Sequence, residues 1–249
     1  MNDTGMIINP GRDKGEPGLP AAGMLLVNPA EAEDGLRLAK SRNGRQYFLY
    51  NSRLALIPAA PPAGSFFMAG PAVGAPMAVL TLEKLIALGA RRVIVYGWCG
   101  SLSETLRTGD FLLPTWAVSS EGTSAHYPLA SRPESHEPMR QLLAEVLTAQ
   151  GLTVRSGPVW TTDAPYRESI AQVGQLGGQG ILGVDMEYGA LVAAAAFRKI
   201  ELTAVLLVSD ELQSGKWNPG FRTKDFKKKS RAILHFLADF CSGLAAANS

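Results

Sequence analysis

Residues 183–191 read Gly-Val-Asp-Met-Glu-Tyr-Gly-Ala-Leu, and this stretch decides how the rest of the chain is interpreted. A short apolar run, Ile181 to Val184, leads into two carboxylates, Asp185 and Glu187, and the small apolar run that follows predicts a helix. The helix dipole favours negative charge at the start of a helix. The two carboxylates can therefore accept hydroxyl protons from a bound polyol, or they can be ordinary helix caps. Spacing alone leaves both interpretations open.

The composition predicts a compact globular protein. Of 249 residues, 46% are hydrophobic and 18% are charged, and a chain of this length can bury a large core. The formal net charge of +2 is too small to indicate nucleic acid as a partner. The one basic run, residues 224–231, opens an amphipathic helix and is typical of a solvated face.

The cysteines and the N-terminal residues indicate in which cellular compartment the protein is expected. Cys99 and Cys241 have no metal-ligand spacing around them, and we interpret both as reduced thiols of a cytoplasmic protein. Residues 1–22 contain no apolar segment of the kind found in signal peptides, and we expect them to form a mobile tail. No run reaches the roughly 18 apolar residues that are needed to cross a membrane. We therefore expect no membrane partner.

The order of the predicted elements indicates one domain over residues 23–249. Strands are expected at residues 23–27, 46–50, 53–57 (with a turn at 51–52), 65–69, 91–96, 110–118, 154–161 and 202–208. Helices are expected after Pro29, before Gly89, at 137–150, after Glu187 and at 224–244. Residues 65–96 form a βαβ unit, which predicts parallel strands. The expected architecture is a single three-layer α/β/α domain with a central mixed, partly parallel sheet.

Polar or glycine-rich clusters are expected at the ends of four strands. They are residues 70–76, the turn Gly97–Ser101, the pair Asp185 and Glu187, and the pair Ser209 and Asp210. In sheets with parallel strands, ligands bind beyond the carboxyl ends of the strands, so the four clusters together indicate one site. The glycine turns have neither the spacing of a P-loop nor that of a dinucleotide fingerprint.

The same motifs carry a resemblance to a known family. In chain order they are Gly97-Trp98-Cys99-Gly100-Ser101-Leu102, Gly122-Thr123-Ser124-Ala125-His126-Tyr127, Thr161-Thr162-Asp163, Val184-Asp185-Met186-Glu187 and Val208-Ser209-Asp210. Their order and separations resemble those of the nucleoside phosphorylase superfamily, which includes purine nucleoside phosphorylases, uridine phosphorylases and methylthioadenosine nucleosidases. The resemblance runs from Leu25 to the last helix. It implies cleavage of the N-glycosidic bond of a nucleoside through an oxocarbenium-like transition state.

The resemblance also implies roles for individual residues. Met186 and Glu187 match the residues that bind ribose. The attraction between a fixed glutamate and the sugar is strongest when positive charge develops on the sugar in the transition state. Asp210 matches the aspartate that protonates or hydrogen-bonds the leaving base, which favours a purine-like base. Glu187 and Asp210 are therefore the expected catalytic residues. The remaining matches place Ser209, Thr162 and Asp163 beside the base and His126 at the ribose.

The phosphate half of the site departs from the family pattern. The first strand of the family ends in Gly-Asp-Pro-x-Arg, whereas residues 27–31 read Val-Asn-Pro-Ala-Glu. A second arginine of the family corresponds to Val95, and a small hydroxyl residue corresponds to Trp98. A charge-assisted hydrogen bond contributes about 1.5 to 3 kcal/mol, so the loss of two arginines weakens phosphate binding by about twice that. The expected pocket for phosphate or water is lined by Gly97, Trp98, Cys99, Gly100, Glu33 and, from a neighbouring subunit, Arg45.

Three functions therefore stay open, none of them with a cofactor or a metal ion. The first is phosphorolysis, with inorganic phosphate as the co-substrate. The second is hydrolysis by a water that Glu33 or Glu31 activates, with Glu33 as the better match. The third is a nucleoside-binding protein without catalysis. The shared Arg45 implies a homo-oligomer built from dimers, such as a hexamer, and residues 216–221 have the aromatic and flexible residues that a lid needs.

Overall fold

The computed structural model of the chain describes residues 5–50, 52–59 and 62–246. Its strands are β1 (Ala22–Leu26), β2 (Arg45–Leu49), β3 (Ser52–Ile57), β4 (Phe66–Gly70), β5 (Arg92–Ser101), β6 (Phe111–Ser120), β7 (Val154–Thr162), β8 (Gly183–Asp185), β9 (Glu201–Glu211) and β10 (Asn218–Pro219). Its α-helices are α1 (Pro29–Ser41), α2 (Ala75–Leu88), α3 (Glu137–Ala149), α4 (Ile170–Gly178), α5 (Tyr188–Arg198) and α6 (Lys224–Ala246), and its 3₁₀ helices are η1 (Ser124–His126) and η2 (Pro165–Arg167). Residues 1–4 of the expected tail, residue 51 of the expected turn and residues 247–249 of the expected domain lie outside the described residues.

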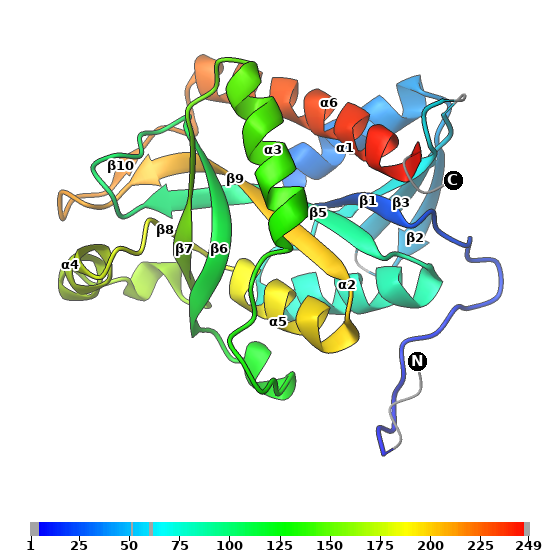
Figure 1. Cartoon of the computed structure of the whole chain (residues 1–249), viewed down its shortest axis with the longest axis horizontal. Coiled ribbons are helices and arrows are strands. Elements are labelled where there is room, and N and C mark those ends of the chain that lie inside the picture. Colours follow the sequence, from blue (N-terminus) through cyan, green and yellow to red (C-terminus); the bar gives the residue numbers. More distant parts are fainter. Residues whose placement is uncertain (1–4, 51, 60–61, 247–249) are drawn as a thin grey trace.

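The described strands form one ten-stranded mixed sheet (Figure 1). Their order is β10-β9-β6-β7-β8-β5-β1-β4-β3-β2, and β5 also pairs with β9. This additional pairing closes β5, β9, β6, β7 and β8 into a ring, whereas β1, β4, β3 and β2 continue from the ring as an open sheet. Both parallel pairs, such as β1 with β5, and antiparallel pairs, such as β5 with β8, are present. The predicted α/β fold with a central mixed, partly parallel sheet is confirmed.

Helices cover both faces of the sheet. On one face α1, α3 and α6 bury side chains such as Met24 and Tyr96, and on the other face α2 and α5 bury side chains such as Leu25 and Val95. Successive strand residues point to opposite faces, which is why Met24 and Leu25 belong to different cores. Figure 1 shows α1 and α6 above the sheet and α2 and α5 below it. No helix in the described part of the chain is long and apolar enough to cross a membrane.

The prediction of a glycine turn at Gly97–Ser101 is wrong, because these residues continue β5. Gly100 pairs with Val184 of β8 on one side and with Asp210 of β9 on the other. A Cβ atom on Gly100 would lie 2.4 Å from Leu212 Cδ1, so the glycine permits a close approach within the sheet rather than a turn. The two strands that flank the end of β5, β8 and β9, therefore both carry an acidic residue.

Helix α4 was not predicted. Gly174, Gly177 and Gly178 interrupt its apolar pattern, and glycine disfavours helices by about 1 kcal/mol per residue. Ser169 compensates at the start of the helix, where its side chain accepts a hydrogen bond from the backbone N–H of Gln172.

Part of the expected tail lies against α2. Lys84 Nζ is 2.8 Å from Asp13 Oδ2 and 2.7 Å from Glu16 Oε2. The backbone N–H of Leu19 donates a hydrogen bond to the carbonyl of Leu88. Lys84 is buried on α2, so the two acids supply the negative charge that a buried ammonium group requires.

Candidate active site

Three donors hold Asp185 at the junction of β8 and α5. Its Oδ1 accepts a hydrogen bond from Thr161 Oγ1 at 2.6 Å. Its Oδ2 accepts from the backbone N–H groups of Glu187 at 3.1 Å and of Tyr188 at 2.6 Å. The N-cap residue of α5 is Glu187, so Asp185 is not itself the N-cap; it binds the N–H groups of the N-cap and of the first helical residue from two positions before the cap. Asp185 therefore has a structural role in holding the start of α5.

Replacing Asp185 with alanine should destabilise the folded chain. The change leaves Thr161 and two backbone donors unpaired in a buried place, and we expect the free energy of unfolding to fall by about 2 to 3 kcal/mol. Denaturant unfolding followed by circular dichroism measures this loss. Asp163→Ala is the matched control, because Asp163 is exposed and accepts one bond, from the N–H of Gly122. A loss for Asp185→Ala no larger than that of the control would contradict this structural role.

Glu187 is buried beside the start of α2. Its Oε1 accepts a hydrogen bond from the backbone N–H of Gly74 at 2.6 Å, and the residue is only 6% exposed. Gly74 precedes α2 with a φ of 82°, a conformation that glycine adopts without steric cost. The Glu187 carboxylate therefore lies at the positive end of the α2 dipole.

Burial shifts the pKa of both acids upwards. Burial, and then the charge of Asp185, raise the pKa of Glu187 to about 8. Burial also raises the pKa of Asp185, to about 6. The hydrogen bonds from Thr161 and from the start of α5 lower this pKa, but burial has the larger effect. Neither acid forms an ion pair with another described residue. Two buried acids without a cation form a site that attracts positive charge on a ligand.

Asp210 lies across β5 from Asp185. Its Oδ1 accepts a hydrogen bond from Ser209 Oγ at 2.5 Å, and its Oδ2 accepts from Trp217 Nε1 at 2.9 Å. Burial, and then the charges of Asp185 and Asp210, raise the pKa of the buried Cys99 thiol on β5. The next residue of this strand, Gly100, pairs with Val184, which precedes Asp185, and with Asp210. The acids of β8 and β9 therefore converge around the end of β5.

Trp98 and Glu31 bind each other on the face of β5 that α1 and α6 cover. Trp98 Nε1 donates to Glu31 Oε1 at 3.1 Å, and Ser230 Oγ donates to the same oxygen at 2.5 Å. Ser230 Oγ is also 2.9 Å from the hydroxyl of Tyr96. Glu31 Oε2 is buried and has no donor among the described residues. Burial raises the pKa of Glu31, so this carboxyl is less acidic than an exposed glutamate.

A row of aromatic rings connects Trp98 with Asp210. The centroid of the Trp98 ring lies 5.8 Å from that of Phe221, and the centroid of Phe221 lies 6.3 Å from that of Trp217. Trp217 then donates to Asp210, although its side chain is 60% exposed. The segment that was expected to form a lid returns along β9, because residues 218–219 form β10.

Glu33 does not enter the site. It is 69% exposed and pairs with Arg37 at 2.6 Å, whereas Glu31 is 4% exposed. Residues two positions apart on a helix do not face the same side, so the packing of α1 buries only one of the two acids. The preference for Glu33 over Glu31 as a residue of the water pocket is therefore contradicted.

The structure brings only some of the other predicted residues next to the acids. Thr162 is buried at the end of β7, beside Thr161, and Met186 is half-buried between Asp185 and Glu187. His126 is exposed on η1, which packs on α5. Arg45 is exposed on β2, the terminal strand of the open sheet, so its expected role at the site requires a second chain.

Several contributors were missed from the sequence. The motif Thr161-Thr162-Asp163 pointed to Thr161, and the glycine cluster 70–76 contained the donor Gly74. Nothing in the local pattern pointed to Ser230, which lies within the basic helix and donates to Glu31. This contact joins segments that are distant in the sequence.

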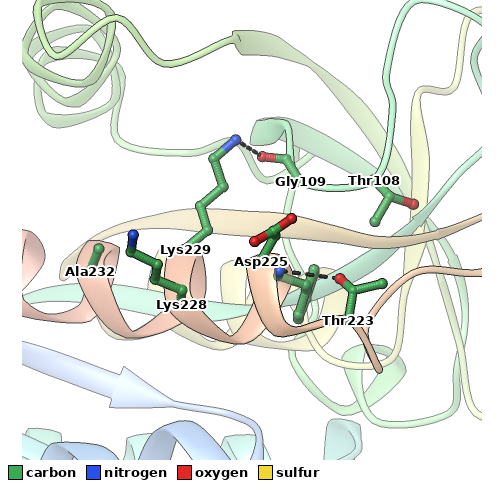
Figure 2. Close-up of a pocket in the computed structure, with 8 residues that line it drawn as sticks. Thr108, Gly109, Thr223, Asp225, Lys228, Lys229 and Ala232 are labelled. Atoms are coloured by element: carbon green, nitrogen blue, oxygen red, sulfur yellow. Dashed lines mark hydrogen bonds between the residues drawn. The ribbon is translucent and has the colours of Figure 1, made fainter.

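A separate pocket of about 410 Å³ lies beside the start of α6 (Figure 2). It is lined by Thr108, Gly109, Thr223, Asp225, Phe226, Lys228, Lys229 and Ala232. In Figure 2, Lys229 reaches across to the carbonyl of Gly109, to which its Nζ donates at 2.5 Å. None of the predicted site residues lines this pocket, so we define the candidate site by its acids.

Asp185 at the end of β8 and Asp210 at the end of β9 lie on the two sides of β5 in a mixed α/β sheet, and neither pairs with a cation among the residues that the structure describes. The chain belongs to the Phosphorylase superfamily, because the model of this family matches residues 32–242. The expected membership of the nucleoside phosphorylase group is confirmed.

Relatives in this family include purine nucleoside phosphorylases. The DeoD-type enzymes of Bacillus thuringiensis (strain Al Hakam) and Bacillus mycoides (strain KBAB4) are each 31% identical to this chain over 150 residues. These matches cover 59% of this chain and 64% of each relative. The chain thus matches less than two thirds of the length of these relatives.

Two solved structures share the fold. The purine nucleoside phosphorylase of Toxoplasma gondii in complex with immucillin-H has a TM-score of 0.79 at 19% sequence identity, and the match covers 92% of both chains. The uridine phosphorylase of Vibrio fischeri ES114 has a TM-score of 0.74 at 18% identity, and the match covers 93% of both chains. At these sequence identities the similarity shows the fold only. It does not distinguish a purine nucleoside from uridine as the substrate of this chain.

Proposed function

We propose that this protein cleaves the N-glycosidic bond of a purine-like nucleoside. The observation that carries the proposal is the position of Glu187 and Asp210, two acids that lie at strand ends on either side of β5. Glu187 binds the hydroxyls of the ribose and stabilises the positive charge that develops at the anomeric carbon. Asp210 supplies a proton to the leaving base, which departs more readily as a neutral purine.

The attacking group in this proposal is water. Phosphate carries negative charge, and Glu31 occupies the position at which the resemblance implies a phosphate-binding arginine. The Trp98 side chain donates to Glu31 and fills the same region. A carboxylate with a raised pKa is better matched to removing a proton from water near neutral pH. Phosphorolysis is the second candidate, since the family is named for phosphorylases.

Free base released from a panel of purine and pyrimidine nucleosides, with and without phosphate, tests this function. We expect release from the purine nucleosides at a rate that phosphate does not change. Glu31→Gln keeps the size of the side chain but removes its basic carboxylate, so hydrolysis should fall by about 10²- to 10⁴-fold.

The matched control for this experiment is Glu33→Gln, which changes an exposed acid of the same helix and should leave the rate unchanged. A rate that depends on phosphate and is unaffected by Glu31→Gln would refute water as the attacking group. Binding of nucleosides without any release of base would refute the enzymatic function and support a nucleoside-binding protein.

A further inference from the structure

Asn28 and Glu31 each have one buried side-chain oxygen without a donor among the described residues. These atoms are Asn28 Oδ1 and Glu31 Oε2, and Glu31 as a whole is only 4% exposed. The large majority of buried polar side-chain atoms in folded proteins have a hydrogen-bond partner. Two such oxygens within one turn of a helix therefore indicate a place that receives hydrogen-bond donors from a ligand.

The two residues lie on the same side of the start of α1. Asn28 is the N-cap of this helix and Glu31 follows it by three positions, a spacing that makes the two side chains neighbours. Asparagine at an N-cap usually accepts a hydrogen bond from an N–H group of the first turn. The Asn28 side chain forms no such bond, so the helix itself does not use its amide oxygen.

The orientation of the Glu31 carboxylate is fixed through its other oxygen. Oε1 accepts hydrogen bonds from Trp98 Nε1 at 3.1 Å and from Ser230 Oγ at 2.5 Å. The Trp98 ring in turn packs edge-on against Phe226, with 5.1 Å between the ring centroids. Strand β5 and helix α6 thus hold one oxygen of Glu31, and Oε2 is left for another donor.

The end of β1 is adjacent to the segment that binds Glu187. Asn28 follows Val27 directly, and the carbonyl of Val27 accepts a hydrogen bond from the N–H of Ala72 at 2.9 Å. Two residues further along this segment, the N–H of Gly74 donates to Glu187 Oε1 at 2.6 Å. Asn28 therefore follows a strand end that is bonded to the same segment as the proposed ribose-binding acid.

Two neighbouring acceptors, of which one is a carboxylate, favour a small ligand with two hydrogens to donate. Water meets this requirement, and buried water molecules typically form about three hydrogen bonds to polar groups that otherwise lack a partner. A water that donates to both oxygens keeps its lone pairs free. Phosphate fits the pair poorly, because it carries negative charge and the Glu31 carboxylate repels it.

We propose that Asn28 orients the attacking water together with Glu31. This inference rests on the proposed function, in which water attacks the nucleoside. The water donates one hydrogen to Asn28 Oδ1 and the other to Glu31 Oε2, and a free lone pair faces the anomeric carbon. As the bond from the water oxygen to this carbon forms, a water proton moves to Glu31. The N-glycosidic bond breaks, its electron pair passes to the base, and the base takes a proton from Asp210.

Competition between water and methanol tests the position of the water. Methanol has a single O–H group, so a methanol that donates to Glu31 leaves Asn28 Oδ1 without a donor. With a purine nucleoside in a water–methanol mixture, we expect the wild-type protein to form ribose as nearly the sole sugar product. Asn28→Leu, which has a similar size and no acceptor, should raise the ratio of methyl riboside to ribose by about tenfold, the effect of one hydrogen bond. Asn28→Asp keeps the oxygen and should keep the wild-type ratio.

The rate of base release provides a second measurement. Asn28→Leu should lower kcat by about tenfold or more with little change in KM, because Asn28 binds the water and not the nucleoside. Gln150→Leu, which removes an exposed amide at the end of α3, is the matched control and should change neither kcat nor the product ratio. Asn28→Ala lacks the same oxygen and provides the comparison if Asn28→Leu does not fold.

The outcomes distinguish this inference from the function on which it rests. If base release is independent of phosphate but the product ratio of Asn28→Leu equals that of the wild type, Asn28 does not orient the water and the proposed function still stands. The same conclusion follows if Asn28→Asp has the ratio expected for Asn28→Leu. If ribose 1-phosphate forms instead, or no base is released, water is not the attacking group and the inference fails together with the proposed function.

Discussion

Glu187→Gln should lower kcat/KM for nucleoside cleavage by about 10²- to 10³-fold. The glutamine keeps the shape of the side chain and an oxygen for the N–H of Gly74, but it removes the negative charge that attracts the positive sugar in the transition state. The loss should appear mainly in kcat, because the charge on the sugar develops only in the transition state. Steady-state kinetics with a purine nucleoside measures it.

The pH dependence provides a second measurement for Glu187. The ionised carboxylate is the active form, and burial raises the pKa of this group to about 8. Activity should therefore rise with pH through the neutral range and level off above about 8, and Glu187→Gln should lack this rise. Glu134→Gln, which changes an exposed acid, is the control and should retain it. A glutamine variant with wild-type kcat would exclude Glu187 from the chemistry.

Asp210→Asn should lower the cleavage of purine nucleosides by about 10²- to 10⁴-fold. Asparagine still accepts the hydrogen bond of Trp217 but cannot protonate the base. The loss should be much smaller for 4-nitrophenyl riboside, whose leaving group departs without protonation. The comparison of the two substrates thus separates proton donation from a general disturbance of the site.

Asp225→Asn is the control for this experiment, because Asp225 is an exposed acid on α6 outside the candidate site. It should leave the rates with both substrates unchanged. An equal loss with both substrates in Asp210→Asn would contradict the role of Asp210 as the proton donor and would indicate that it positions the ligand instead.

The sequence predicted the features that depend on local pattern. The apolar run before Asp185 and the small residues after Glu187 specify a strand followed by a helix, and β8 and α5 lie where this pattern indicates. Ser209 and Asp210 follow an apolar run, and β9 contains both of them at its end. These residues could be placed because the hydrophobic period identifies each element from neighbouring residues.

Other features depend on contacts between distant segments. The choice between Glu31 and Glu33 follows from which side of α1 packs against α6, where Ser230 binds Glu31. Glycines at a turn and glycines in a crowded strand have the same local pattern, and only the approach of Leu212 to Gly100 distinguishes them. Helix α4 was likewise not predicted, because glycines interrupt its apolar pattern.

In the proposed function, the ring of strands carries the residues that bind sugar and base, whereas the open part of the sheet carries the residue that activates water. Glu187 follows β8 and Asp210 lies on β9, and both strands belong to the ring, whereas Glu31 follows β1 in the open part of the sheet. Substitutions at the start of α1 can consequently alter the attacking group while the parts that bind sugar and base keep their positions. In the proposed function, a change of the attacking group therefore involves residues 27–31 outside the ring together with Val95 and Trp98 on β5 within it.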